Sequence, residues 1–226
     1  MSWFSNLWAT TIGKKIVMAV TGLIVFGFVL GHMSGNLLIF AGPEVFNGYA
    51  HTLQTSGPLL WGTRITLLLA IPLHIVSAVQ LTRLNMGARQ QAYAKHEKKA
   101  TTPMAMMMKY GGLLLMVFIL LHLAHYTLHL THPQFATYLT AEGHHDAYRM
   151  VIEGFSDPVY VGLYVLSMLA LWGHLDHGAW SMFQTLGLSH PDYDDARRNF
   201  ARVFAAIIVL GFSSVPIYVL ITGGAA

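Results

Sequence analysis

The sequence contains an apolar stretch, residues 16–40, that is long enough to cross a bilayer and carries a histidine, His32, deep inside it. Crossing a bilayer core takes about 20 predominantly apolar residues of helix. An ionisable side chain inside such a segment is costly and marks a functional site by default. What His32 does depends on whether other segments supply partners at the same depth.

The composition indicates an integral membrane protein. Of the 226 residues, 54% are hydrophobic and 10% are charged, whereas soluble domains are about 25% charged. The basic residues lie at the ends of apolar stretches and form no stripe, so we expect no nucleic-acid partner. The chain has no cysteine, which excludes thiolate-held iron–sulfur clusters and covalent haem attachment. Any metal has to be held by histidine or oxygen.

Five apolar segments predict an all-α fold, a single domain over residues 1–226 that forms an integral membrane bundle of five transmembrane helices. Prolines near the segment starts, Pro58, Pro103 and Pro158, fit the first turn of a helix. Residues 1–15 are amphipathic and predict an interfacial segment. We expect no cleavable signal peptide, because the first apolar segment is too long for one. The predicted spans are 16–40, 58–84, 104–130, 158–183 and 200–221.

The basic residues predict the orientation, because lysine and arginine are retained on the cytoplasmic side. Eleven of the thirteen lie in the amino-terminal segment or close to the connections between spans two and three and spans four and five. We therefore expect a bacterial-type cytoplasmic membrane, with the amino terminus in the cytoplasm and the carboxyl terminus outside.

Each of the first four spans carries one histidine well inside its apolar stretch, and the fifth carries none. At about 1.5 Å per residue, His32 and His122 lie ~20–25 Å from their cytoplasmic flanks, in the outer half. His74 and His174 lie about nine residues from the cytoplasmic ends of their spans, in the inner half. The sequence thus offers an outer pair and an inner pair, each drawn from two different helices.

Two imidazoles from different helices can hold a flat macrocycle between them. Bis-imidazole ligation fills both axial positions of haem iron and favours electron transfer over binding of oxygen or substrate. Two such haems, one in each half of the bilayer, make an electron path between its faces. The alternative, a hydrogen-bonded packing role for each histidine, explains the matched depths less well.

Several further histidines remain candidates or are assigned to solvent. His125 and His129 follow His122 at helical spacing and stay open as third-span ligands or as quinone or propionate contacts. His177 shares a face with His174 nearer the cytoplasm. The remaining histidines fall in expected loops and are interpreted as solvated: His51, His96, His132, His144, His145 and His190.

Five motifs resemble those of a known family. They are GHMSGNLLIF, GPEVFNGYAHTL, PLHIVSAVQL, LLHLAHYT and GHLDHGAWSMF, spread over nearly the whole chain. The sequence is similar to the dihaem cytochrome b anchor subunit of succinate:quinone oxidoreductases and fumarate reductases. The resemblance implies the axial ligands His32, His74, His122 and His174, with the first span paired to the third and the second to the fourth.

The resemblance also implies partners. The anchor should bind an FAD-containing flavoprotein and an iron–sulfur subunit on the cytoplasmic face, and a menaquinone or ubiquinone near the outer haem. FAD and the clusters would belong to those partner subunits, and the whole complex could form a higher oligomer. Some family members carry a proton-moving glutamate two residues before the fourth-span ligand, where this chain has Trp172. Glu44 in the first outer connection is the one acid placed to act near an outer quinone.

The sequence therefore predicts a two-haem electron-relay subunit without dicarboxylate chemistry of its own. The alternative in the same class is a haem b anchor of another respiratory enzyme, such as a hydrogenase or formate dehydrogenase. The alternative in a different class is a histidine-dependent transporter of metal or protons.

Overall fold

The computed structural model describes residues 3–88 and 103–223, and these residues form helices and no strand. Most of the basic connection between spans two and three, with His96, lies outside them. The helices are α1 (Trp3–Ala9), α2 (Thr11–Asn36), α3 (Pro43–Thr55), α4 (Gly57–Gly87), α5 (Pro103–Tyr126), α6 (Ala147–Gly154), α7 (Pro158–Thr185) and α8 (Asp194–Thr222), with short 3-10 turns η1 (Leu37–Ala41), η2 (Pro133–Thr137) and η3 (Pro191–Tyr193).

Five of these helices, α2, α4, α5, α7 and α8, are long and apolar enough to cross a membrane, which confirms the all-α membrane fold. The helix bounds differ from those of the predicted spans at several ends. Helix α5 ends at Tyr126 instead of residue 130, and α8 begins at Asp194 instead of residue 200.

Local capping explains where two of the long helices begin. The Thr10 side chain accepts a hydrogen bond from the amide of Gly13 at 2.9 Å, so α2 begins at Thr11, well before the apolar stretch. Asp157 caps α7 by accepting from the amide of Val159 at 2.8 Å, with Pro158 in the first turn as predicted. A cap of this kind satisfies an amide that the helix itself leaves without a partner.

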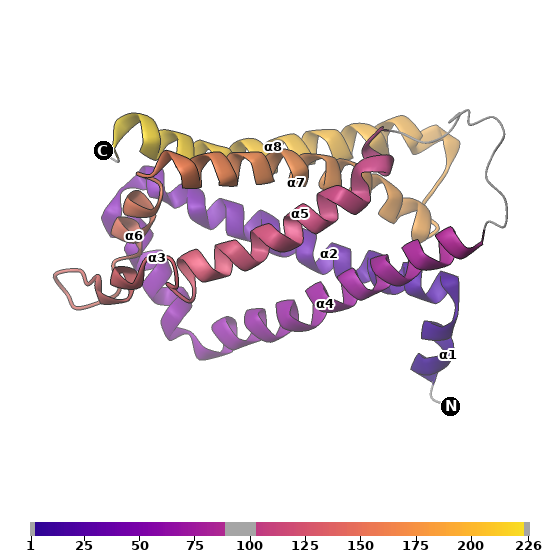
Figure 1. Ribbon diagram of the computed structural model, residues 1–226, viewed down its shortest axis with the longest axis horizontal. Helices are drawn as coiled ribbons and strands as arrows, with labels where there is room; N and C mark the ends of the chain where they lie inside the picture. Colours follow the sequence, from indigo (N-terminus) through magenta and orange to yellow (C-terminus); the bar gives the residue numbers. More distant parts are fainter. Residues whose placement is uncertain (1–2, 89–102, 224–226) are drawn as a thin grey trace.

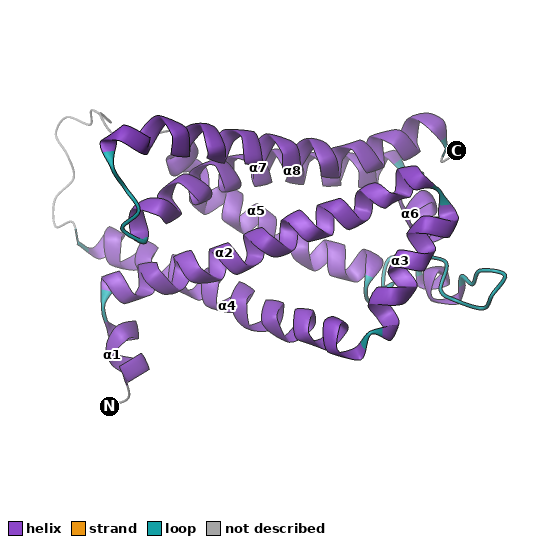
Figure 2. Cartoon of the chain, turned by 180° about the vertical axis from the view of Figure 1, so that it is seen from behind, coloured by secondary structure: helices purple, strands orange, loops and turns teal. Residues whose placement is uncertain are grey.

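The long helices run side by side and pack in a definite order (Figure 1). Helix α4 packs against α2, and α5 packs against α7, while α8 lies along α7 and also touches α2. The view from behind shows α2 and α4 diverging toward α3 (Figure 2). Large apolar side chains such as Leu68, Leu120 and Leu210 are more than 60% exposed on the outside of this bundle. That surface suits contact with lipid.

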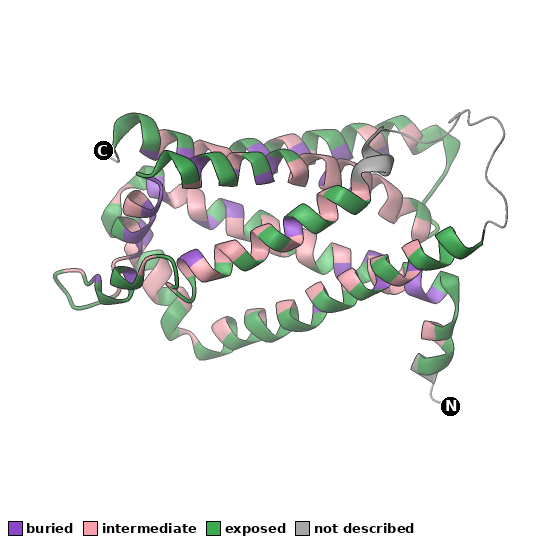
Figure 3. Cartoon of the chain, in the orientation of Figure 1, coloured by how far each residue is buried: buried purple, intermediate pink, exposed green. Residues whose placement is uncertain are grey.

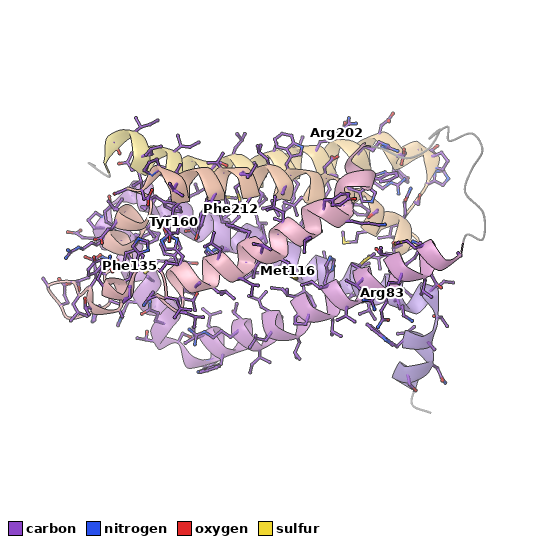
Figure 4. All side chains as sticks on the ribbon, viewed as in Figure 1. Arg83, Met116, Phe135, Tyr160, Arg202 and Phe212 are labelled. Atoms are coloured by element: carbon purple, nitrogen blue, oxygen red, sulfur yellow. The ribbon has the colours of Figure 1, made fainter. Side chains whose placement is uncertain are left out.

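One end of the bundle carries a compact cap, formed by α3, η2 and α6. Its core includes Ile39, Phe135 and Val219, all fully buried, and buried positions gather in α6 (Figure 3). The opposite end carries the amino terminus, with Arg83 and Arg202 (Figure 4). We call these ends the cap end and the amino-terminal end.

The cap corrects a prediction, because the first outer connection is the helix α3 and not a loop. Asn47 on α3 donates to Oδ1 of Asp146 at 2.9 Å and accepts from the amide of Tyr148 at 2.8 Å. These bonds fasten α3 to the start of α6, 99 residues later in the chain. His51 therefore lies on a helix, where its ring stacks on that of His144 at 3.8 Å.

A carboxylate in the cap is held ionised by hydrogen bonds. The Tyr138 hydroxyl donates to Oε2 of Glu153 at 2.5 Å, and the Gln134 amide donates to Oε1 at 3.1 Å. These two bonds hold the pKa of Glu153 below its ordinary value of 4.5. A group whose pKa is lowered by folding stabilises the fold above its unfolded pKa, and this contribution is lost as the pH falls through the folded pKa.

Tyr138→Phe should therefore lower the thermal unfolding midpoint in detergent at pH 7, with a difference from the wild type that shrinks as the pH falls below 4.5. Tyr148→Phe, which removes another hydroxyl in the same cap, serves as control. An unfolding difference that stays constant from neutral to acid pH would contradict the role of Glu153.

Candidate functional site

The four intramembrane histidines meet as two pairs. The ring centroids of His32 and His122 are 5.7 Å apart with an angle of 74° between their planes. Those of His74 and His174 are 6.1 Å apart at 60°. The structure thus brings together the same partners that depth along the helices predicted.

Each pair joins two helices that do not pack closely on each other. His32 on α2 meets His122 on α5, and His74 on α4 meets His174 on α7. The close packing partners are different ones, α2 with α4 and α5 with α7. The two rings of a pair therefore approach each other from helices whose backbones stand apart, as they must if a group is to be held between the rings.

The two pairs lie at different depths. His74 contacts α2 at Thr21, eleven residues before His32, which corresponds to ~16 Å along the helix. On α7, Tyr164 contacts His122 and lies ten residues before His174, which corresponds to ~15 Å. Two helices thus give the same separation, and the His32–His122 pair is the one nearer the cap end.

Hydrogen bonds orient three of the four rings through Nδ1. His74 Nδ1 lies 3.0 Å from the carbonyl oxygen of Met18, and His122 Nδ1 lies 3.3 Å from the Tyr164 hydroxyl. His32 Nδ1 lies 3.4 Å from the Asn36 amide nitrogen. In the described part of the chain no hydrogen bond engages Nε2 of these rings. His74 and His122 have the arrangement of ligating histidines, with Nδ1 beside an oxygen and Nε2 available to a metal. The Asn36 amide nitrogen can only donate, so His32 Nδ1 would act as an acceptor in that contact.

The pair distances fit haem iron. A nitrogen–metal bond of about 2 Å on each side, with about 1 Å from each nitrogen to its ring centre, places two axial imidazoles about 6 Å apart. The observed separations are 5.7 and 6.1 Å. The pairs are less suited to binding a metal ion without a macrocycle, because the described residues contain no group of three or more His, Cys, Asp or Glu side chains able to hold one.

A cavity adjoins the His32–His122 pair. Its volume is about 350 Å³, and it lies where α2 and α4 diverge. One of its walls is Phe28, whose ring stacks on His32 at 5.3 Å. The other lining residues are apolar or glycine except Thr63 and Thr66, whose hydroxyls form no hydrogen bond within the described residues. The cavity therefore offers an apolar slot with two available hydroxyl groups.

His125 lies one helical turn beyond His122 and does not reach the surface of the protein. Its side chain is fully buried, with its ring 4.0 Å from that of Tyr126 and 4.3 Å from that of Tyr160. Nδ1 lies 3.2 Å from the Tyr164 hydroxyl, while Nε2 is buried without a partner in the described structure. His125 thus belongs to an aromatic cluster at the cap end and does not face His32.

His129 does not continue the helical face of His122 and His125. Helix α5 ends at Tyr126, and His129 has the left-handed φ of 51°. Its ring stacks on His145 at 5.9 Å, so it belongs to the cap.

The two other candidates form no hydrogen bond or ring contact with the four paired histidines among the described residues. Glu44 is exposed in the first turn of α3, where a carboxylate favourably faces the helix amino terminus. His177 is half-buried on α7, with its ring 6.1 Å from that of Trp180.

Four polar contacts of the pairs were missed by sequence reasoning: Tyr164, Thr21, Asn36 and the carbonyl of Met18. A tyrosine or threonine inside an apolar span is a detectable signal, since its hydroxyl needs a partner there. The carbonyl carries no signal in the sequence. Comparison of the chain with protein-family models, curated proteins and solved structures gives no significant match.

A glycine on α2 gives the His74 ring its space. A β-carbon at Gly22 would lie 3.2 Å from Cε1 of His74. Gly22→Val should displace this ring. If each pair holds a haem, the purified protein should then lose the spectral component of the His74–His174 pair and keep that of the other pair. Gly27→Val, on the same helix where a β-carbon meets nothing within 4 Å, should leave haem content unchanged. Equal haem content in the two variants would refute this role of Gly22.

Proposed function

We propose that this chain is the dihaem membrane anchor of a succinate:quinone oxidoreductase or fumarate reductase. It relays electrons between cytoplasmic flavoprotein and iron–sulfur subunits and a quinone in the membrane. The observation that carries the proposal is the presence of two histidine pairs, each spaced for one iron, at two depths of one membrane bundle. The motifs quoted above support this choice of enzyme.

The bound haems supply reversible one-electron transfer. The chain's residues fix where this happens: His32 with His122 toward the cap end, and His74 with His174 toward the amino-terminal end. A haem held by two imidazoles would serve electron transfer and would not bind oxygen or substrate. The Nδ1 contacts of His74 and His122 hold these two rings in place, and the apolar helices keep water away from both pairs.

The quinone is assigned to the half of the bundle near the cap. The cavity between α2 and α4 suits a flat ring, because its walls are apolar and the Thr63 and Thr66 hydroxyls can donate to carbonyl oxygens. Trp172 stands where some family members have a proton-moving glutamate, so a proton route through that position is not part of the proposal. Glu44, exposed on α3, is the acid available at the cap end.

The orientation follows from the basic residues. We place the amino-terminal end in the cytoplasm of a bacterial-type cell, where it would dock the iron–sulfur subunit next to the His74–His174 pair. The cap and the carboxyl terminus are placed outside. Electrons from succinate would then enter at the inner haem, and electrons for fumarate reduction would leave there.

The purified protein should show a reducible α-band of low-spin cytochrome b with about two haems per chain. His74→Ala and His174→Ala should each remove the same component, and His32→Ala and His122→Ala should each remove the other, because each pair holds one iron. Redox titration of the four variants measures this. Absence of haem from the wild type would refute the function, and loss of one shared component from His32 and His174 variants would refute the pairing.

The orientation can be tested with single cysteines, because the chain has none of its own. Glu142→Cys in the exposed connection at the cap end should react with a membrane-impermeant maleimide in intact cells. Ala88→Cys, exposed at the end of α4, should react only after permeabilisation. The reverse pattern would place the cap in the cytoplasm.

A further inference from the structure

Tyr164 on α7 lies between two histidines of α5. Its hydroxyl is 3.3 Å from Nδ1 of His122 and 3.2 Å from Nδ1 of His125. The tyrosine side chain is buried, and its ring is fixed by edge-to-face contacts with Phe118 at 5.0 Å and Phe155 at 4.9 Å. One immobile hydroxyl thus serves both rings.

The direction of these hydrogen bonds follows from the proposed function, on which this inference rests. A neutral imidazole that offers Nε2 to iron carries its proton on Nδ1. His122 Nδ1 then donates to the Tyr164 oxygen, which leaves the tyrosine proton to be donated to Nδ1 of His125. His125 must accept at Nδ1 and carry its own proton on Nε2.

The two α5 histidines therefore differ in role although they are only one turn apart. His122 faces His32 at 5.7 Å. His125 is enclosed by the rings of Tyr126 and Tyr160, near the cap end where Figure 4 labels Tyr160. As the terminal acceptor of a chain that begins at His122, it has a hydrogen-bond partner for Nδ1, while its Nε2 has none among the described residues.

The other pair is held by different groups. His74 is held by the main-chain carbonyl of Met18 at 3.0 Å, with the Thr21 hydroxyl at 3.3 Å. A change at Tyr164 therefore acts on one pair only, and the His74–His174 pair becomes an internal reference in the same molecule.

We propose that Tyr164 is a positioning residue for the ligand His122, fixing its ring and its Nδ1 proton, with His125 as the hydrogen-bond acceptor behind it and not a ligand. An acceptor on Nδ1 makes the ring a stronger donor to the metal, which favours the oxidised iron. Removing that acceptor should raise the midpoint potential of the haem held by His32 and His122.

The test compares Tyr164→Phe with Tyr160→Phe, which removes a hydroxyl near His125 that has no hydrogen bond to His122. Tyr164→Phe should keep both haems. It should raise the midpoint potential of the cap-side haem, the one held by His32 and His122, and change the low-spin electron paramagnetic resonance signal of that haem. The midpoint potential of the inner haem, held by His74 and His174, should not change. Tyr160→Phe should change the potential of neither haem. The proposal would be overturned if Tyr164→Phe left the potential and the resonance signal of the cap-side haem unchanged. It would also be overturned if the midpoint potentials of both haems shifted equally.

His125→Leu keeps the proposal testable if Tyr164→Phe does not fold. We expect His125→Leu to retain both haems with the inner component unchanged and the cap-side signal altered, since the Tyr164 hydroxyl has then lost its acceptor. Loss of the cap-side haem from this variant would make His125 the ligand and overturn the inference. Failure of the function itself is distinguishable, because the wild-type protein would then bind no haem.

Discussion

An imidazole inside an apolar helix needs a partner, because the lipid around it offers no hydrogen-bonding group. Four of the five long helices carry this cost, and in each case the ring meets another histidine, at 5.7 Å or 6.1 Å. The fold serves this requirement, since α2, α4, α5 and α7 must approach at two depths while leaving space between the rings. Helix α8 has no histidine and packs along α7 instead.

Orientation and pairing come from different neighbours. His74 on α4 is held by the Met18 carbonyl on α2, and His122 on α5 is held by Tyr164 on α7. In both cases the orienting group belongs to the helix that packs closely. The opposing histidine comes from a helix that does not. Close packing therefore orients His74 and His122, and the more distant helix supplies the opposing histidine of each pair.

The spans and the histidine pairs could be predicted because both depend on local regularities. Proline and capping residues mark helix starts, and a constant rise per residue converts sequence position into depth. The pairs need only that conversion and a known direction for each span. The assignment of iron to them, and of the partner subunits, rests on chemistry and on motifs and stays a prediction.

The cap could not be predicted, because its contacts join residues far apart in sequence. Helix α3 is stabilised by Asn47 and Asp146, 99 residues apart. Helix α5 ends without a glycine or proline signal, through bonds from the Leu128 amide to the Leu123 carbonyl and from Leu130 to Ala124. Because of these bonds the helix ends before His129, which therefore does not share a helical face with His122 and His125. The burial of His125 likewise depends on Tyr160 of another helix.

The two pairs differ in what surrounds them, and this difference suits a relay. The buried core of the cap extends to Tyr164, so the His32–His122 pair is continuous with a structure built outside the membrane span. In the other pair, His74 is held by the Met18 carbonyl and the Thr21 hydroxyl of α2, and neither group belongs to the cap. Haem potentials depend on hydrogen bonding to the ligands and on burial. Under the proposed function, two irons ligated by the same residue type thus acquire unequal potentials from their neighbours, and this inequality gives the electron transfer between them a preferred direction.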